Sequence, residues 1–290
     1  MKPIPYGKHE INKEDIESVV DVLKSDFLTQ GPRVEEFEMK FAAYVGSKYA
    51  VAVSNGTAAL HLAALSLGVR KGTKIITSPI SFVATANCIE YCGGEITFCD
   101  IDPETLCMDI RALKNILEKS PKGTYQGVIP VDFAGYPIQM DQIRSIANEY
   151  KLWILEDSCH APGGYFIDNK GVNQNCGNGS YADAAIFSFH PVKHIACGEG
   201  GMVTTNDQKI YNKLKLYRSH GITKDSNKLN YNYDDWYYEM QTLGYNYRLS
   251  DIQCALGISQ LKKAKLNIEK RKYLAERYIR AFRPLKNEIF

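Results

Sequence analysis

Two side chains that could act together on one ligand follow two separate apolar segments of this sequence. Residues 152–155 lead directly to Glu156 and Asp157, and residues 184–189 lead to Lys193. A carboxylate at the end of a buried strand can hold a heteroaromatic nitrogen protonated, which turns the ring into an electron sink. A lysine among apolar residues is desolvated, so it loses its proton more readily and can attack an aldehyde as a free amine. We therefore predict these two roles for Asp157 and Lys193.

Other residues close to these two in sequence allow more than one interpretation. His160 and the carboxylates of Glu156 and Asp157 are possible metal ligands, but suitable ligand types do not recur with the spacing of a metal site, so we predict no metal. Glu156 would then be a solvated or structural partner. Ser188 precedes Lys193 and could donate a hydrogen bond to a phosphate.

A phosphate site is predicted where residues 54–60 turn from the first apolar strand into a helix. The N–H groups at a helix start, the positive end of the helix dipole and the Thr57 hydroxyl would bind a phosphate beside Gly56. An ordinary capped helix has the same pattern. Phe82 follows the next strand and would either cover one face of a planar cofactor or pack in the core.

A polar segment, residues 243–251, precedes the last helical pattern of the chain. Ser250 or Asp251 would cap that helix. Asn246 and Arg248 are either ordinary residues of a polar loop or groups that bind a phosphate or a substrate. Considered together with the other segments, they become candidates for the second role.

The elements that must position these residues alternate along the chain. Strands are expected at residues 49–53, 74–77, 96–99, 127–131, 152–155 and 184–189, and helices at 57–67 and 140–150, after two N-terminal helices that begin near Asn12 and Val34. This alternation predicts an α/β fold in which a mostly parallel sheet lies between helices. Sites in such sheets form at the carboxyl ends of the strands, where the candidate residues lie. Residues 168–181 are expected to form an excursion between strands.

Composition excludes several other classes of protein. Lys and Arg number 35 against 33 Asp and Glu, so the formal charge is +2, and no basic run suggests a nucleic-acid partner. Residues 1–10 lack the apolar core of a signal peptide, and no later stretch has the length of a membrane span, so we expect a cytoplasmic protein. The eight cysteines lack paired CxxC spacing and are expected to be reduced and mostly buried.

Taken together, these segments resemble the DegT/DnrJ/EryC1/StrS family of sugar aminotransferases, fold-type I enzymes that depend on pyridoxal 5′-phosphate (PLP). The resemblance extends from residues 28–32 to residues 251–253, and its separate motifs occur in the expected order. Residues 188–193 (SFHPVK), 218–223 (RSHGIT) and 236–239 (WYYE) are similar to the C4 aminotransferases of pseudaminic acid biosynthesis. The implied fold is a seven-stranded, mostly parallel sheet between helices, with a small C-terminal α/β domain.

The resemblance implies a role for each candidate residue. The catalytic residues would be Lys193, which carries the cofactor, Asp157, the partner of its pyridine nitrogen, and His160, which lies near it. Further cofactor contacts would come from Gly56, Thr57 and Ser188 at the phosphate, Phe82 on the ring, and Asn246, which in this family reaches the phosphate of the neighbouring subunit. The substrate residues would be His190, Tyr245 and Arg248. The role of Asn246 implies a homodimer with shared active sites.

The resemblance also implies a reaction. An amino group would move from L-glutamate to the 4-keto carbon of a UDP-linked 4-keto-6-deoxy-N-acetyl hexosamine, and ping-pong kinetics would follow because both substrates use one site. Two alternatives stay open: a C3 or C4 aminotransferase for another nucleotide keto sugar, and a PLP-binding remnant with little turnover. The remnant is considered because family members continue beyond position 290. We expect a large PLP-binding domain at residues 1–249 and the start of an incomplete small domain at residues 250–290.

Two further classes agree less well with the sequence. Related PLP enzymes that remove a sugar hydroxyl have histidine at the lysine position, whereas this chain has Lys193. A Rossmann-type nucleotide binder needs a GxGxxG turn after its first strand, whereas residues 54–57 are SNGT. Both are therefore ranked below a PLP-dependent aminotransferase.

Overall fold

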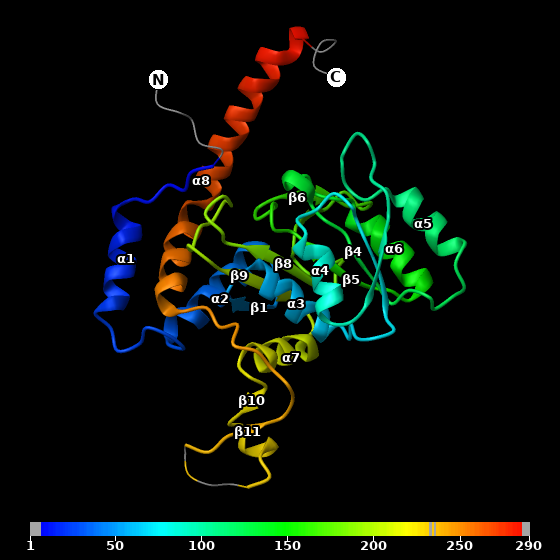
Figure 1. The fold of residues 1–290 in the computed structure, drawn as a ribbon. Helices are drawn as coiled ribbons and strands as arrows, with labels where there is room; N and C mark the ends of the chain where they lie inside the picture. Colours follow the sequence, from blue (N-terminus) through cyan, green and yellow to red (C-terminus); the bar gives the residue numbers. More distant parts are fainter. Residues whose placement is uncertain (1–6, 232–233, 235, 286–290) are drawn as a thin grey trace.

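The computed structural model describes residues 7–231, 234 and 236–285 (Figure 1). Its strands are β1 (Tyr49–Val53), β2 (Lys74–Thr77), β3 (Glu95–Phe98), β4 (Gly127–Ile129), β5 (Trp153–Asp157), β6 (Tyr165–Ile167), β7 (Asn173–Asn175), β8 (Ala184–Ser188), β9 (Gly201–Thr205), β10 (Ile222–Thr223) and β11 (Glu239–Met240). Its α-helices are α1 (Lys13–Leu23), α2 (Pro32–Val45), α3 (Gly56–Ser66), α4 (Ala84–Tyr91), α5 (Ile110–Glu118), α6 (Met140–Tyr150), α7 (Gln208–Arg218) and α8 (Asp251–Phe282). Residues 1–6 of the stretch considered for a signal peptide, and residues 286–290 of the expected small domain, lie outside the described residues.

One seven-stranded sheet forms the centre of the molecule, in the strand order β1-β9-β8-β5-β4-β2-β3. The strands from β8 to β3 pair in parallel, whereas β9 is antiparallel to both of its neighbours, β1 and β8. The mostly parallel α/β sheet expected from the sequence is therefore confirmed. The six expected strands agree with β1, β2, β3, β4, β5 and β8 to within two residues at each end. The seventh strand, β9, was not recognised, because its buried residues directly follow a glycine-rich turn.

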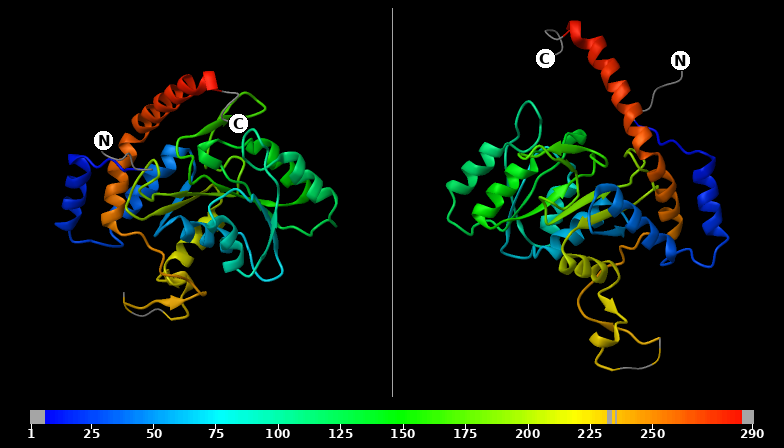
Figure 2. Two further views of the ribbon diagram at one scale, coloured as in Figure 1. Left: turned by 45° about the horizontal axis from the view of Figure 1, so that its top comes forward. Right: turned by 180° about the vertical axis from the view of Figure 1, so that it is seen from behind.

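Alternate residues of the strands face opposite layers of helices, as the two-residue period of a strand requires. Val51, Leu155 and Ile186 face the layer that contains α3, α4 and α7. Ala52 and Phe187 face the other layer, where α2 and α8 cover one half of the sheet and α5 and α6 cover the rest. Figures 1 and 2 show helices on both faces. Both faces of the sheet are thus buried, which is typical of parallel sheets.

The ends of three helices follow the expected signals. Asn12 caps α1, and Gly46 ends α2 in the left-handed conformation with φ of 89°. Ser250 caps α8 and accepts a hydrogen bond from the backbone N–H of Gln253, so the cap is Ser250 rather than Asp251. The buried Asp251 carboxylate instead accepts hydrogen bonds from two backbone N–H groups at the start of α2. It therefore joins the starts of two helices that are distant in sequence.

Several of the described segments lie outside both the central sheet and the helices that cover it. The C-terminal half of α8 projects away from the body, and β10 and β11 pair in an arm on the opposite side (Figures 1 and 2). The expected excursion at residues 168–181 contains β7, which pairs with β6 in a small antiparallel hairpin. The division into domains at residue 250 stays a prediction.

The remaining expectations from composition concern cysteines and membrane spans. All eight cysteines are free, and each is buried or partly buried, as expected. Within the described residues, no helix combines the length and the apolar character that a membrane span requires.

A buried ion pair connects the two helical layers to β1. Arg218, at the end of α7, pairs with Glu38 of α2, and both side chains are almost completely buried. The Glu38 carboxylate also accepts the N–H of Ala52, while the Arg218 guanidinium donates to the carbonyl oxygen of Ala52. Each charge is therefore compensated by the other and by the backbone of Ala52 in the edge strand β1.

Replacing Glu38 with Ala should lower the free energy of unfolding by about 3–5 kcal/mol, because it leaves the Arg218 charge buried without its partner. Urea denaturation measures this change. The control is Glu35→Ala on the same helix, where the side chain is exposed and the expected change is less than about 0.5 kcal/mol. Equal stabilities of the two variants would contradict the role given to the ion pair.

Candidate active site

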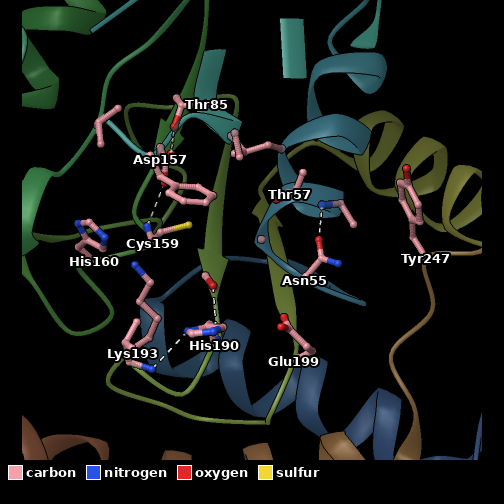
Figure 3. A pocket seen from close by; sticks show the side chains of 18 of the residues that line it. Asn55, Thr57, Thr85, Asp157, Cys159, His160, His190, Lys193, Glu199 and Tyr247 are labelled. Carbon is pink, nitrogen blue, oxygen red and sulfur yellow. Dashed lines mark hydrogen bonds between the residues drawn. The ribbon is translucent and has the colours of Figure 1, made fainter. Parts of the chain in front are cut away.

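A cavity of about 760 Å³ opens at the carboxyl ends of the parallel strands (Figure 3). Asp157 is the last residue of β5 and Ser188 the last residue of β8, and the two strands pair in parallel. The start of α3 forms the neighbouring wall, with Gly56 and Thr57, and the loop after β8 adds Lys193. The cavity therefore lies where parallel sheets of this class bind their ligands.

The Asp157 carboxylate is buried, and both of its oxygens accept hydrogen bonds. Thr85, in α4, donates its hydroxyl to Oδ2 at 2.7 Å, and the backbone N–H of Cys159 donates to Oδ1 at 3.2 Å. Hydrogen bonds from two directions fix the plane of the carboxylate. Asp157 is thus a rigid acceptor at the wall of the cavity.

Lys193 extends from the loop after β8 into the same space as Asp157 and His160 (Figure 3). A turn positions it, because the backbone N–H of Lys193 donates to the carbonyl oxygen of His190 at 2.8 Å. Burial lowers the pKa of the Lys193 amine, although Cys159 and Asp157 act in the opposite direction. A larger fraction of this amine is therefore neutral than for a solvated lysine, and a neutral amine is a nucleophile.

The start of α3 packs directly against the end of β8. Asn55 caps the helix by accepting the N–H of Ala58 at 2.8 Å. A Cβ atom on Gly56 would lie 3.0 Å from the Cβ of Ser188, so only glycine allows this approach without displacing β8. The N–H groups of the first helical turn and the Ser188 hydroxyl thus border one corner of the cavity, an arrangement that suits an anion.

Two rings and a carboxylate complete the cavity. Phe82 lies at the rim with 69% of its surface exposed. His160 accepts the backbone N–H of Ala134 at its Nδ1 atom, at 3.2 Å. Burial and the neighbouring Lys193 lower the pKa of His160, so its imidazole is neutral at neutral pH. Glu199 lies on the side of the cavity opposite Asp157 (Figure 3).

Most of the residues selected from the sequence lie together. The cavity is lined by Gly56, Thr57, Phe82, Asp157, His160, Ser188, His190 and Lys193. Tyr245, Asn246 and Arg248 are not among the described residues that line it. In their extended segment the Tyr245 ring packs against His61, with ring centroids 4.8 Å apart, Asn246 is exposed, and Tyr247 lines the cavity instead.

The lining residues that sequence reasoning did not select include four with polar side chains: Thr85, Cys159, Glu199 and Tyr247. Thr85 lies in the segment that contains Phe82, but no local signal marks a hydroxyl that reaches Asp157. Of the two interpretations of Glu156, the structural one is correct, because its buried side chain accepts the N–H of Gly177 at 3.1 Å and points away from the cavity side of β5.

Comparisons with known proteins agree with this geometry. The model of the DegT/DnrJ/EryC1/StrS aminotransferase family matches residues 9–290. A UDP-4-amino-4,6-dideoxy-N-acetyl-beta-L-altrosamine transaminase of Campylobacter jejuni is 40% identical over 288 residues, which cover 99% of this chain and 71% of the relative.

The solved structures that resemble this chain are also aminotransferases. PseC of Helicobacter pylori, an aminotransferase involved in the biosynthesis of pseudoaminic acid, has a TM-score of 0.84 and 37% identity, over 97% of this chain and 71% of that one. A Streptococcus pneumoniae protein solved in its PLP form has a TM-score of 0.82 and 27% identity, over 96% of this chain and 71% of that one. The chain therefore belongs to the DegT/DnrJ/EryC1/StrS aminotransferase family, and it is a PLP-dependent sugar aminotransferase.

Proposed function

We propose that this enzyme transfers the amino group of L-glutamate to the 4-keto carbon of a UDP-linked 4-keto-6-deoxy-N-acetyl hexosamine, for the synthesis of pseudaminic acid or another surface-glycan sugar. The observation that carries the proposal is that Asp157, Lys193 and the start of α3 border one cavity. The names of the Campylobacter transaminase and of Helicobacter PseC support the class of sugar. A cytoplasmic location is part of the same proposal.

The residues present fit three of the polar groups of PLP. The desolvated amine of Lys193 suits the aldehyde, and the fixed carboxylate of Asp157 suits a protonated pyridine nitrogen. The corner made by Gly56, Thr57 and Ser188 suits the phosphate. When bound, the cofactor supplies an aldehyde that amines attack and a ring that draws electrons from the reacting carbon.

The roles of the other cavity side chains follow from this orientation of the cofactor. Phe82 would cover one face of the ring from the rim, where its own surface is otherwise exposed. Asp157 would keep the ring nitrogen protonated, since Thr85 and the backbone of Cys159 hold its two oxygens in place. His160, being neutral, would add a hydrogen bond rather than a charge.

Lys193 would also move the proton in each half-reaction. Once the donor amine has replaced it, the Lys193 Nζ atom is a free amine whose pKa is lowered by burial, which suits a general base. It would take the proton from the α-carbon of the amino donor and deliver it to the carbon on the other side of the donor nitrogen. The same steps in reverse, with the sugar bound, would place the amine on the sugar carbon.

A second copy of the chain would complete the site. Asn246 is exposed, while its neighbour Tyr247 faces the cavity of its own chain. An exposed Asn246 is accessible to the phosphate held by another subunit, and the enzyme would then be a homodimer with shared sites. Among the sugar-binding candidates, His190 lines the cavity itself, and Tyr245 and Arg248 belong to the segment of Asn246.

The reaction is tested by supplying PLP, ¹⁵N-labelled L-glutamate and the UDP-linked 4-keto sugar, and by analysing the sugar by mass spectrometry. The labelled nitrogen should replace the 4-keto oxygen with the wild-type enzyme and with Lys209→Ala, a surface control, and should be absent with Lys193→Ala. Labelled product from Lys193→Ala would contradict the role of Lys193. Labelling of a different keto sugar alone would show that the proposed substrate is wrong.

Replacing Thr85 with Val should weaken PLP binding about tenfold or more, because a hydrogen bond to a charged group contributes about 1.5–3 kcal/mol. Spectroscopic titration of the cofactor-free protein measures the dissociation constant. The matched control is Thr77→Val, which removes a buried hydroxyl that donates to the carbonyl oxygen of Ile129, outside the cavity. This control should lose thermal stability but keep its PLP affinity. Equal PLP affinities of Thr85→Val and the wild type would refute the role given to Thr85.

A further inference from the structure

Two fully buried carboxylates, Asp132 and Glu156, lie behind the active-site wall. Asp132 Oδ1 accepts the backbone N–H of Ile138 at 3.0 Å, and Oδ2 accepts the hydroxyl of Ser158 at 2.8 Å. Potential ligand atoms of Asp132, Glu156 and Cys176 lie within 4.8 Å of one another. Carboxylates buried this close together do not both ionise. Burial raises the pKa of Asp132 to about 6 and raises that of Glu156 well above its usual value, so Glu156 keeps the proton and Asp132 accepts hydrogen bonds.

Asp132 begins a tight turn that contacts the active site. Its backbone N–H donates to the carbonyl oxygen of Asp157 at 3.0 Å, and its carbonyl oxygen accepts the N–H of Gly135 at 3.1 Å. The side-chain bond to Ile138 closes the turn at its far end. Asp132 thus fixes the turn at its start, in its middle and at its end.

The turn is in direct contact with His160. Ala134 has a positive φ of 53°, and its N–H donates to His160 Nδ1 at 3.2 Å. A Cβ atom on Gly135, where φ is 84°, would lie 2.8 Å from the carbonyl oxygen of His160. The position of the His160 ring therefore depends on the shape of the turn.

The hydrogen bond from Ala134 determines which ring nitrogen carries the proton. A backbone N–H only donates, so His160 Nδ1 must accept, and in a neutral imidazole the proton then lies on Nε2. Nδ1 faces the turn while the ring lines the cavity beside Lys193, so Nε2–H is left for a bound molecule (Figure 3).

We propose that Asp132 is a positioning residue, which acts through the turn of residues 132–138 to hold His160 as the Nε2–H tautomer. The cavity then receives a hydrogen-bond donor from His160 and no basic nitrogen. His160 would donate to an oxygen of a bound molecule and would take no proton from it, which leaves Lys193 as the group that moves protons. Only the hydrogen bond from His160 to a bound molecule rests on the proposed function, because the tautomer of His160 is a property of the chain itself.

The tautomer is measured by NMR on the full chain labelled with ¹⁵N in its histidine rings, with the His160 signals identified by their loss in His160→Gln. In the wild type, Nδ1 should resonate as an unprotonated nitrogen and Nε2 as a protonated one. Asp132→Ala removes both side-chain bonds of the turn, so signals averaged over both tautomers are expected. Asp132→Asn keeps an oxygen acceptor for Ile138 and should restore the wild-type pattern.

Two further variants separate positioning from a general effect on folding. Gly135→Ala disturbs the turn where it meets the His160 backbone and leaves Asp132 intact, so it should give the averaged signals even if Asp132→Ala does not fold. Glu156→Gln replaces a protonated carboxyl with an amide of similar shape and should keep the wild-type pattern. A proton on Nδ1 in the wild type, or unchanged signals in Gly135→Ala, would overturn the proposal. The measurement needs neither cofactor nor sugar, so its outcome is independent of whether the proposed reaction occurs.

Discussion

The parallel pairing of β5 with β8 determines where the reactive groups lie. In this register Asp157 is opposite Ile186, and β8 ends two residues later at Ser188. From there a short loop brings Lys193 over the strand ends, while Gly56 lets α3 approach Ser188. A shift of the register by one residue would turn the side chain of Asp157 to the opposite face of the sheet, so the whole site depends on this pairing.

Two sets of hydrogen bonds compensate the negative charges that are buried beside this pair of strands. At the cavity, Thr85 and the backbone of Cys159 hold the carboxylate of Asp157. Behind it, Glu156 keeps its proton and Asp132 carries the charge, so a single negative charge is buried there, with hydrogen bonds to it from Ser158 and from the backbone. Rigid partners of this kind are what a site needs to keep its acceptors oriented before a ligand arrives.

Local patterns predicted six of the seven strands of the central sheet, the bounds of α3 and α6 to within one residue, and the grouping of Asp157 with Lys193, because parallel strands bring their carboxyl ends to one edge. They did not predict Thr85, since its hydrogen bond to Asp157 spans 72 positions. Nor did they show that Tyr247 rather than Asn246 faces the cavity, because side chains alternate along an extended segment and only the packed structure fixes which set points inward.

The central claim is that one cavity binds PLP through Lys193 and accepts an amino group there. It is tested most directly by the absorbance spectrum of the purified protein, loaded with PLP, before and after addition of L-glutamate. The account predicts a visible band of cofactor attached to Lys193, which glutamate converts to the near-ultraviolet band of the aminated cofactor. A visible band that does not respond to glutamate would contradict the first half-reaction, and no band after PLP is supplied would contradict cofactor binding itself.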